Sequence, residues 1–229
     1  MIMRRNRVQW LIFLSLILVW VLSLSAQSKI YWLSDTGSTR TFYRANTDGS
    51  QIEKLATVLY SDQMHNFVID TLRQRFYVAW HAGRIYSYSF DGQISEQLLK
   101  KTIEKDNKTY GPYALTWHRK SDKLYFSVAN TIYRCDMDGS HVEVVFESTG
   151  AITDIQIDEE NDRIFWASSA TNRKQNSTIF TANLDGSSKR ALYSGNLEYV
   201  LDIKHISLYL TEEHLYFSWG VWGGGYFSS

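Results

Sequence analysis

The chain has 229 residues, of which 44% are apolar and 15% aromatic, so it can bury a sizeable core. Its 24 basic and 24 acidic residues give a net charge of zero, which excludes the basic excess expected of a nucleic-acid-binding protein. The high content of Tyr, Phe and Trp favours strands over helices.

The N-terminal residues 1–28 have the layout of a secretory signal peptide. Three arginines precede an apolar run at 10–24, and small residues at 23–28 suit cleavage. The alternative is an uncleaved anchor, and in both cases the remainder faces the lumen or the outside. We therefore expect a secreted or extracellular protein. Membrane contact is expected only if this segment stays as an anchor or the full gene encodes a later span.

Two N-glycosylation acceptor triplets lie in polar stretches of the remaining chain. They begin at Asn107 and Asn176. Behind a signal peptide both become plausible acceptors, so we predict a glycoprotein.

The remaining chain, 29–229, contains four Asp-Gly pairs at similar spacing. In each repeat the Asp lies six and five residues after the two members of a bulky pair, such as Ile132-Tyr133 before Asp138. We expect each Asp-Gly to form a two-residue hairpin turn, since glycine adopts positive φ without a Cβ clash. The glycines are 43, 47 and 47 residues apart. The pairs are Asp48-Gly49, Asp91-Gly92, Asp138-Gly139 and Asp185-Gly186.

Each repeat shows four short strand patterns in the same order. The first precedes a polar turn, the second carries an aromatic doublet, the third leads into Asp-Gly and the fourth leaves it. The first strands are expected at 67–69, 114–117 and 152–157, and a fifth copy is expected to start at 200–203 and to turn near 212–214. We expect the doublets to fill the space between neighbouring sheets. The doublets are Tyr31-Trp32, Phe76-Tyr77, Tyr125-Phe126, Phe165-Trp166 and Tyr216-Phe217.

Four antiparallel strands per repeat, with a period in the forties, indicate the blades of a β-propeller. No segment after residue 28 has a convincing helical period. We therefore predict an all-β fold of the propeller type.

The doublets and turns also resemble a known family. Lys29-Ile30-Tyr31-Trp32, and Arg163-Ile164-Phe165-Trp166 with the later Asp185-Gly186-Ser187, look like the YWTD repeat of low-density lipoprotein receptor propellers. That family includes the Wnt co-receptors and nidogen, and its domains are six-bladed. The resemblance implies an extracellular propeller module that binds a protein ligand.

The chain departs from that family in two ways. The Thr-Asp half of the motif is mostly absent, since Leu33, Val78, Ser127 and Ala167 follow the doublets. The 201 residues after Ser28 supply about four and a half blades at this period. We therefore expect an incomplete six-bladed-type propeller, truncated at its C-terminal end, and hence a fragment.

Enzymatic motifs are sparse. The six histidines lack metal-site spacings, so any pair could ligate a metal only if the fold brought it together. Cys135, the single cysteine, is expected to be a core thiol, with intermolecular pairing or a reactive thiol as the alternatives. Four aspartates lie on or near the first strands of their repeats, where they could hold a metal or cap turns. They are Asp70, Asp154, Asp158 and Asp202.

We therefore predict a protein-binding module, with no enzyme activity and no cofactor. The ligand contacts are expected from exposed loops, with four candidates. The alternative is a metal-dependent hydrolase or lactonase on the same six-bladed frame. The candidate contacts are His81, Trp117, Trp219 and Trp222.

Overall fold

The computed structural model describes most of the chain after the N-terminal segment. The described ranges are 28–36, 39–59, 64–81, 83–100, 103–105, 108–169, 177–195, 203–211 and 214–221. The expected signal segment, Asn107, Asn176, Asp202 and Trp222 lie outside these ranges. Within them, no helix has the length and apolar content needed to cross a bilayer.

The chain divides into two compact units, Met1–Tyr60 and Ser61–Ser229. The first unit holds one antiparallel sheet in the order β1-β2-β3. Trp32 of the first doublet is half-buried and stacks on Tyr43, with 5.5 Å between ring centroids. The strands are β1 (Lys29–Asp35), β2 (Thr39–Asn46) and β3 (Glu53–Leu59).

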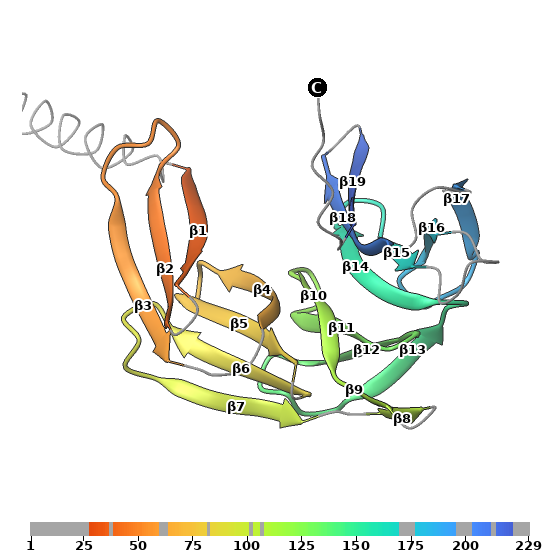
Figure 1. Cartoon of the computed structure of the whole chain (residues 1–229), viewed down its shortest axis with the longest axis horizontal. Helices are drawn as coiled ribbons and strands as arrows, with labels where there is room; N and C mark the ends of the chain where they lie inside the picture. The colour runs from red at the N-terminus through yellow and green to blue at the C-terminus, as the bar shows by residue number, and fades with distance from the viewer. Residues whose placement is uncertain are drawn as a thin grey trace, which may run out of the picture. The chain divides into compact units, whose positions relative to one another are not determined.

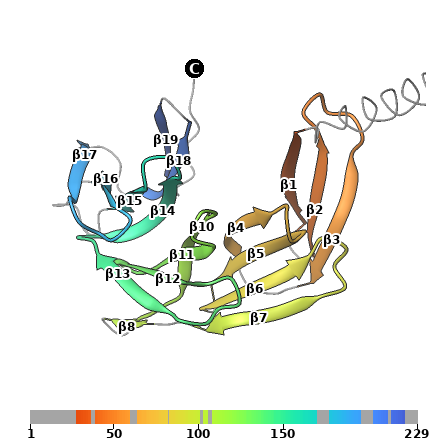
Figure 2. The same ribbon diagram turned by 180° about the vertical axis from the view of Figure 1, so that it is seen from behind.

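The second unit contains three four-stranded antiparallel sheets, each paired in chain order, as Figures 1 and 2 show. The expected four strands per repeat are therefore confirmed. The strands of the first sheet are β4 (Met64–Asp70), β5 (Arg75–Trp80), β6 (Arg84–Ser89) and β7 (Ser95–Lys100). Those of the second are β10 (Pro112–His118), β11 (Lys123–Val128), β12 (Thr131–Asp136) and β13 (Glu143–Glu147). Those of the third are β14 (Ala151–Asp158), β15 (Arg163–Ser169), β16 (Ser177–Asn183) and β17 (Arg190–Gly195).

Two further sheets have two strands each. One joins β18 (Ile203–Leu210) to β19 (Leu215–Val221), so the two strands lie on either side of the turn expected near 212–214. The other, a hairpin of β8 (Ile103–Lys105) and β9 (Lys108–Tyr110), has no counterpart in the expected repeat.

The first strands of successive sheets lie next to each other. β4 contacts β10, β10 contacts β14, and β14 contacts β18. Each four-stranded sheet is therefore a blade, with its first strand innermost and its fourth outermost. The prediction of an all-β, propeller-type fold is confirmed, and the described residues include three four-stranded blades in addition to the three-stranded and two-stranded sheets.

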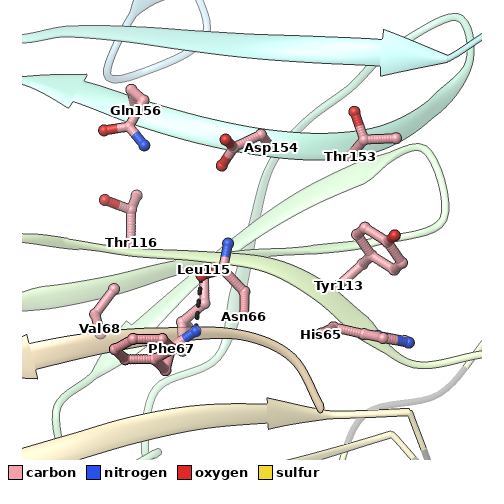
Figure 3. A pocket seen from close by; sticks show the side chains of 10 residues that line it. All are labelled: His65, Asn66, Phe67, Val68, Tyr113, Leu115, Thr116, Thr153, Asp154 and Gln156. Carbon is pink, nitrogen blue, oxygen red and sulfur yellow. Dashed lines mark hydrogen bonds between the residues drawn. The ribbon is translucent and has the colours of Figure 1, made fainter. Parts of the chain in front are cut away.

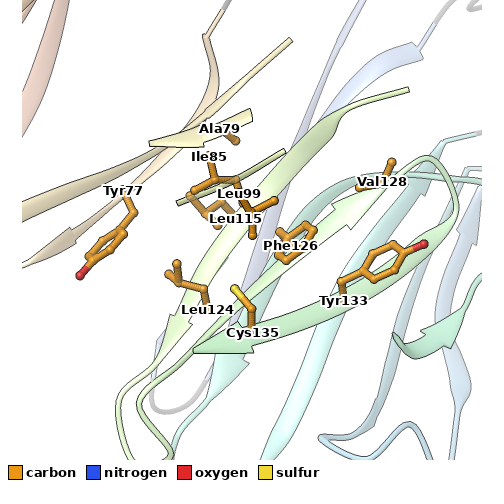
Figure 4. Packing of buried hydrophobic residues seen from close by; sticks show 10 residues of the cluster. All are labelled: Tyr77, Ala79, Ile85, Leu99, Leu115, Leu124, Phe126, Val128, Tyr133 and Cys135. Carbon is orange, nitrogen blue, oxygen red and sulfur yellow. The ribbon is translucent and has the colours of Figure 1, made fainter. Parts of the chain in front are cut away.

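The core lies between neighbouring blades. Figure 4 shows one such cluster, in which Ile85 and Leu99 of the first four-stranded blade meet Leu115, Leu124 and Phe126 of the second. Burial of these apolar side chains stabilises the fold by removing their surface from water. A blade alone leaves this face exposed, so each blade depends on its neighbour.

Cys135 belongs to the same cluster and is completely buried, which confirms the prediction of a core thiol. Burial raises the pKa of this thiol to about 12. The side chain therefore stays a protonated, apolar group at neutral pH.

Strand register corrects one doublet and burial corrects another. Val78 pairs with Phe67, and Phe126 pairs with Leu115 at the equivalent position of the next blade. The pair equivalent to Tyr125-Phe126 is therefore Tyr77-Val78, one residue later than the expected Phe76-Tyr77. Tyr216 is 55% exposed and so is not core, because β19 pairs only with β18 in the described residues and has no outer strands beside it. Five doublet members are fully buried or nearly so: Phe76, Tyr77, Tyr125, Phe126 and Trp166. Phe165 and the two doublet residues of the first unit, Tyr31 and Trp32, are half-buried, and the side chain of Phe217 lies outside the described part.

The Asp-Gly turns are longer than the expected two-residue hairpins. The Gly139 amide donates to the Asp136 carbonyl at 2.9 Å, so Asp138-Gly139 forms the second half of a four-residue turn. The Asp138 carboxylate accepts a hydrogen bond from the Ser140 amide at 2.8 Å, which holds the turn closed. The four turn glycines do have positive φ: +80° at Gly49, +72° at Gly92, +82° at Gly139 and +84° at Gly186.

The turn glycines of two blades also contact the preceding blade. A Cβ added to Gly139 would lie 2.4 Å from the carbonyl oxygen of Leu98 in β7. One added to Gly186 would lie 2.8 Å from the Phe146 ring in β13. The glycine in these turns is therefore required twice, for its backbone conformation and for the close approach to the outer strand of the preceding blade.

We predict that Gly139→Ala destabilises the protein more than Gly49→Ala. Both variants place a Cβ at positive φ, which costs about 1–2 kcal/mol. Only Gly139 adds a clash with backbone atoms, worth about 1–3 kcal/mol more, because an added Cβ at Gly49 meets no heavy atom within 4 Å. Urea unfolding of both variants measures the difference. Equal losses would contradict the proposed contact between blades.

Candidate functional site

A polar pocket of about 380 Å³ lies along the innermost strands of the three four-stranded blades. Its walls come from β4, β10 and β14, strands that are far apart in the sequence (Figure 3). The lining side chains that carry polar groups are His65, Asn66, Tyr113, Thr116, Thr153, Asp154 and Gln156. Such a concave, hydrogen-bonding site at the meeting point of several blades is the default candidate for ligand binding.

A local irregularity turns two of these side chains into the pocket. The register of β4 against β5 shifts between Met64 and Asn66, and that of β14 against β15 shifts between Ile152 and Asp154. A bulge of this kind re-aims a side chain relative to a regular strand. Asn66 and Asp154 occupy equivalent positions, and each carries an oxygen that accepts the next residue's amide, at 2.7 and 2.8 Å.

Asp154 is the buried carboxylate of this site, with 8% of the residue exposed. Its Oδ1 accepts the Ile155 amide, and its Oδ2 accepts the Leu208 amide of β18 at 2.7 Å. Burial raises its pKa to about 6, although the two amide hydrogen bonds oppose this change. The bond from Oδ2 thus ties β14 to the neighbouring inner strand β18, while the bond to Oδ1 stays within β14.

The other described aspartates on inner strands lie at the opposite strand ends and cap turns. The Asp70 carboxylate accepts the Leu72 and Arg73 amides, both at 2.9 Å. The Asp158 carboxylate accepts the Glu160 and Asn161 amides, at 3.0 and 3.1 Å. These carboxylates do not converge with Asp154, and the described residues contain no group of three or more His, Cys, Asp or Glu side chains that could hold a metal.

We call this end of the blades the turn end. It carries the Asp-Gly turns and the polar turns at 71–74, 119–122 and 159–162. Its polar turns are linked from blade to blade. Arg73 donates to both carboxylate oxygens of Asp122 at 3.1 and 2.5 Å. Glu159 accepts the Arg119 amide at 2.7 Å. The turn end is therefore braced by charged groups that serve the structure.

The starts of the inner strands and the β5–β6 turn lie at the other end of the blades, which we call the pocket end. Here His65 and His81 meet, with His81 Nδ1 3.2 Å from His65 Nε2. His65 Nδ1 lies 3.0 Å from the Pro112 carbonyl oxygen. The Tyr113 ring packs against His65, with centroids 4.3 Å apart.

The candidate ligand contacts have different surroundings. His81 is exposed at the pocket end, as expected of a contact residue. Trp117 is part of β10 rather than a loop, packs partly against the core cluster of Figure 4, and has a buried Nε1, so it is a poor contact residue. The side chain of Trp219 and all of Trp222 lie outside the described part of the chain.

Several lining residues were not predicted from the sequence, among them Asn66, Thr116 and Gln156. Thr116 and Gln156 are half-buried and each directly follows a buried apolar residue on its strand, so the period-two pattern could have assigned them to the opposite face. The pattern carries no signal that these faces meet around a common axis.

The comparisons with known proteins support the fold. No family model matches the sequence. The structure is similar to nidogen in a nidogen–laminin complex, with a TM-score of 0.58 and 17% identity over 74% of this chain and 63% of that chain. It is also similar to an oligogalacturonate lyase in complex with manganese, with a TM-score of 0.52 and 9% identity over 69% of this chain and 43% of that chain. The chain thus spans less than two thirds of the length of either structure, and at these identities the likeness concerns the fold alone.

We predict a distinct pH signature for Asp154. Because its pKa of about 6 exceeds the unfolded value of about 3.9, the folded state holds this proton more tightly. The resulting stability is fully present below pH about 4 and is lost as pH rises through about 6. We compare the free energy of unfolding of the wild type with that of Asp154→Asn. The wild-type value minus the variant value should therefore fall as the pH rises from about 4 to above about 6. A difference independent of pH would contradict the burial of this carboxylate.

Proposed function

We propose that this chain is a protein-binding propeller module that acts in the secretory lumen or outside the cell. In this account a partner protein docks on the pocket end and places polar groups into the pocket. The proposal rests on the pocket of three adjacent inner strands, whose lining is rich in neutral hydrogen-bonding side chains. Such groups orient a ligand without the desolvation cost of unpaired charges.

The N-terminal segment and the family resemblance support the extracellular part of the proposal. A polypeptide partner also fits the chemistry of the site, because its backbone and side-chain amides complement Thr116, Thr153 and Gln156. The similarity to nidogen supports the proposal, because that protein, with a similar fold, is seen in complex with another protein, laminin.

A second account is a metal-dependent enzyme on the same fold. One observation favours it: Asp154 is a buried carboxyl with a raised pKa beside a pocket, which is typical of general acids and bases. The amide hydrogen bonds to both of its oxygens favour the structural role instead. Metal analysis of the purified protein, with assays for lactone hydrolysis and polysaccharide cleavage, tests the enzyme account.

We predict that a double substitution in the pocket removes partner binding. The full chain serves as bait for a preparation of secreted proteins, and the captured protein is then titrated against each variant. Thr116→Ala with Gln156→Ala should weaken its binding at least tenfold. Leu72→Ala is the matched control. Leu72 is an apolar residue that is 83% exposed at the turn end, so it would contact a partner that docked on that end instead. Loss of binding in the control, with the pocket variant unaffected, would contradict the proposal.

We also predict that the expressed chain enters the secretory pathway and is glycosylated. Enzymatic removal of N-glycans should lower its apparent mass, and Asn107→Gln and Asn176→Gln should each abolish one part of that change. N-terminal sequencing of the secreted product should locate cleavage between residues 25 and 29. A product that stays in the cytosol without glycans would overturn the extracellular account.

A further inference from the structure

The fold brings together two histidines that are 16 residues apart in the sequence. His65 lies on β4, and His81 lies in the turn between β5 and β6. The facing nitrogens, His65 Nε2 and His81 Nδ1, are 3.2 Å apart, and the ring planes meet at 84°. Two imidazole nitrogens that face each other can share a proton or can both bind one metal ion.

The Pro112 carbonyl fixes which nitrogen of His65 carries the proton. A carbonyl oxygen only accepts hydrogen bonds, so His65 Nδ1, 3.0 Å away, must be the protonated donor. In the neutral ring Nε2 is then left with its lone pair, directed at His81. A backbone carbonyl on the far nitrogen is also the usual outer-shell partner of a metal-ligating histidine, because it fixes the tautomer and orients the ring.

The distance between the two nitrogens suits a small tetrahedral ion. With Zn–N bonds of 2.0–2.1 Å, two ligands at a tetrahedral angle are about 3.3 Å apart, and two at a right angle are about 2.9 Å apart. The observed 3.2 Å lies close to the tetrahedral value. Imidazole nitrogen is a ligand that Zn²⁺ accepts readily.

The backbone holds the two histidines in this arrangement. A Cβ added to Gly111 would lie 2.6 Å from backbone atoms of Gly83 and 2.7 Å from the His81 carbonyl oxygen. The turn that carries His81 therefore packs directly on the residue before Pro112, whose carbonyl orients His65. Both ligands are positioned before an ion arrives, which lowers the ordering cost of binding.

We propose that His65 and His81 form a Zn²⁺ site at the pocket end, with two protein nitrogens and the remaining positions open to water or a ligand group. His65 also lines the pocket, so this site lies within the proposed docking surface, but the proposal does not rest on partner binding. His81 supplies Nδ1 and keeps its proton on Nε2, while His65 supplies Nε2 and keeps its proton on Nδ1 and its hydrogen bond to Pro112.

Calorimetric titration of ZnCl₂ into the full chain, without a histidine tag, tests the proposal. We expect one site whose affinity falls at least tenfold in His65→Ala and in His81→Ala. His81 is exposed, so its variant keeps the fold intact even if His65→Ala does not fold. Gly111→Ala, which retains both histidines but displaces the turn, should also weaken binding.

His141→Ala is the matched control. His141 is exposed at the turn end with its Nδ1 2.7 Å from the Asp136 carboxylate, so it is the rival place for a bound cation. We expect this variant to bind Zn²⁺ like wild type. No measurable Zn²⁺ binding by wild type, unchanged affinity in His81→Ala, or a loss confined to His141→Ala would each overturn the site.

Discussion

The structure depends on one constraint: a four-stranded blade has two faces and can bury them only against its neighbours. The clusters between blades supply the apolar part of this contact, as Leu99 and Phe126 illustrate. The turn glycines supply the close approach, because Gly139 packs on the Leu98 backbone and Gly186 on the Phe146 ring. The same four-residue turn therefore ends one blade's third strand and, in these two blades, seats it on the blade before.

The repeat chemistry was sufficient to predict the fold, because each feature is local. The spacing of Asp-Gly pairs and the period-two alternation identify strands, their order and the four-stranded unit. The predictions that were wrong concern details that depend on how the strands pair and on the hydrogen bonds of the turns. The register of Tyr77-Val78 is set by β4 and β6, the turn around Asp138 by hydrogen bonds that the dipeptide alone does not reveal, and the exposure of Tyr216 by the strands beside β19.

The site was less predictable, because it is assembled by contacts between the inner strands of three blades. Asn66, Thr116 and Gln156 are separated by about one repeat each, and nothing in their own segments indicates that they line one cavity. In the sequence, His65 and His81 are two of six histidines, none of which has the spacing of a known metal-site motif. Asp154 was correctly placed on an inner strand, yet its partner is the Leu208 amide, a contact that no sequence pattern specifies.

In the proposed function, the pocket end of the inner strands is a protein-binding surface. The most direct measurement is an amide hydrogen-exchange footprint of the complex between this chain and the captured partner. The account predicts slowed exchange at the starts of β4, β10 and β14 and in the β5–β6 turn, with unchanged exchange in the polar turns of the turn end. Protection confined to the turns at 71–74, 119–122 and 159–162 would contradict it.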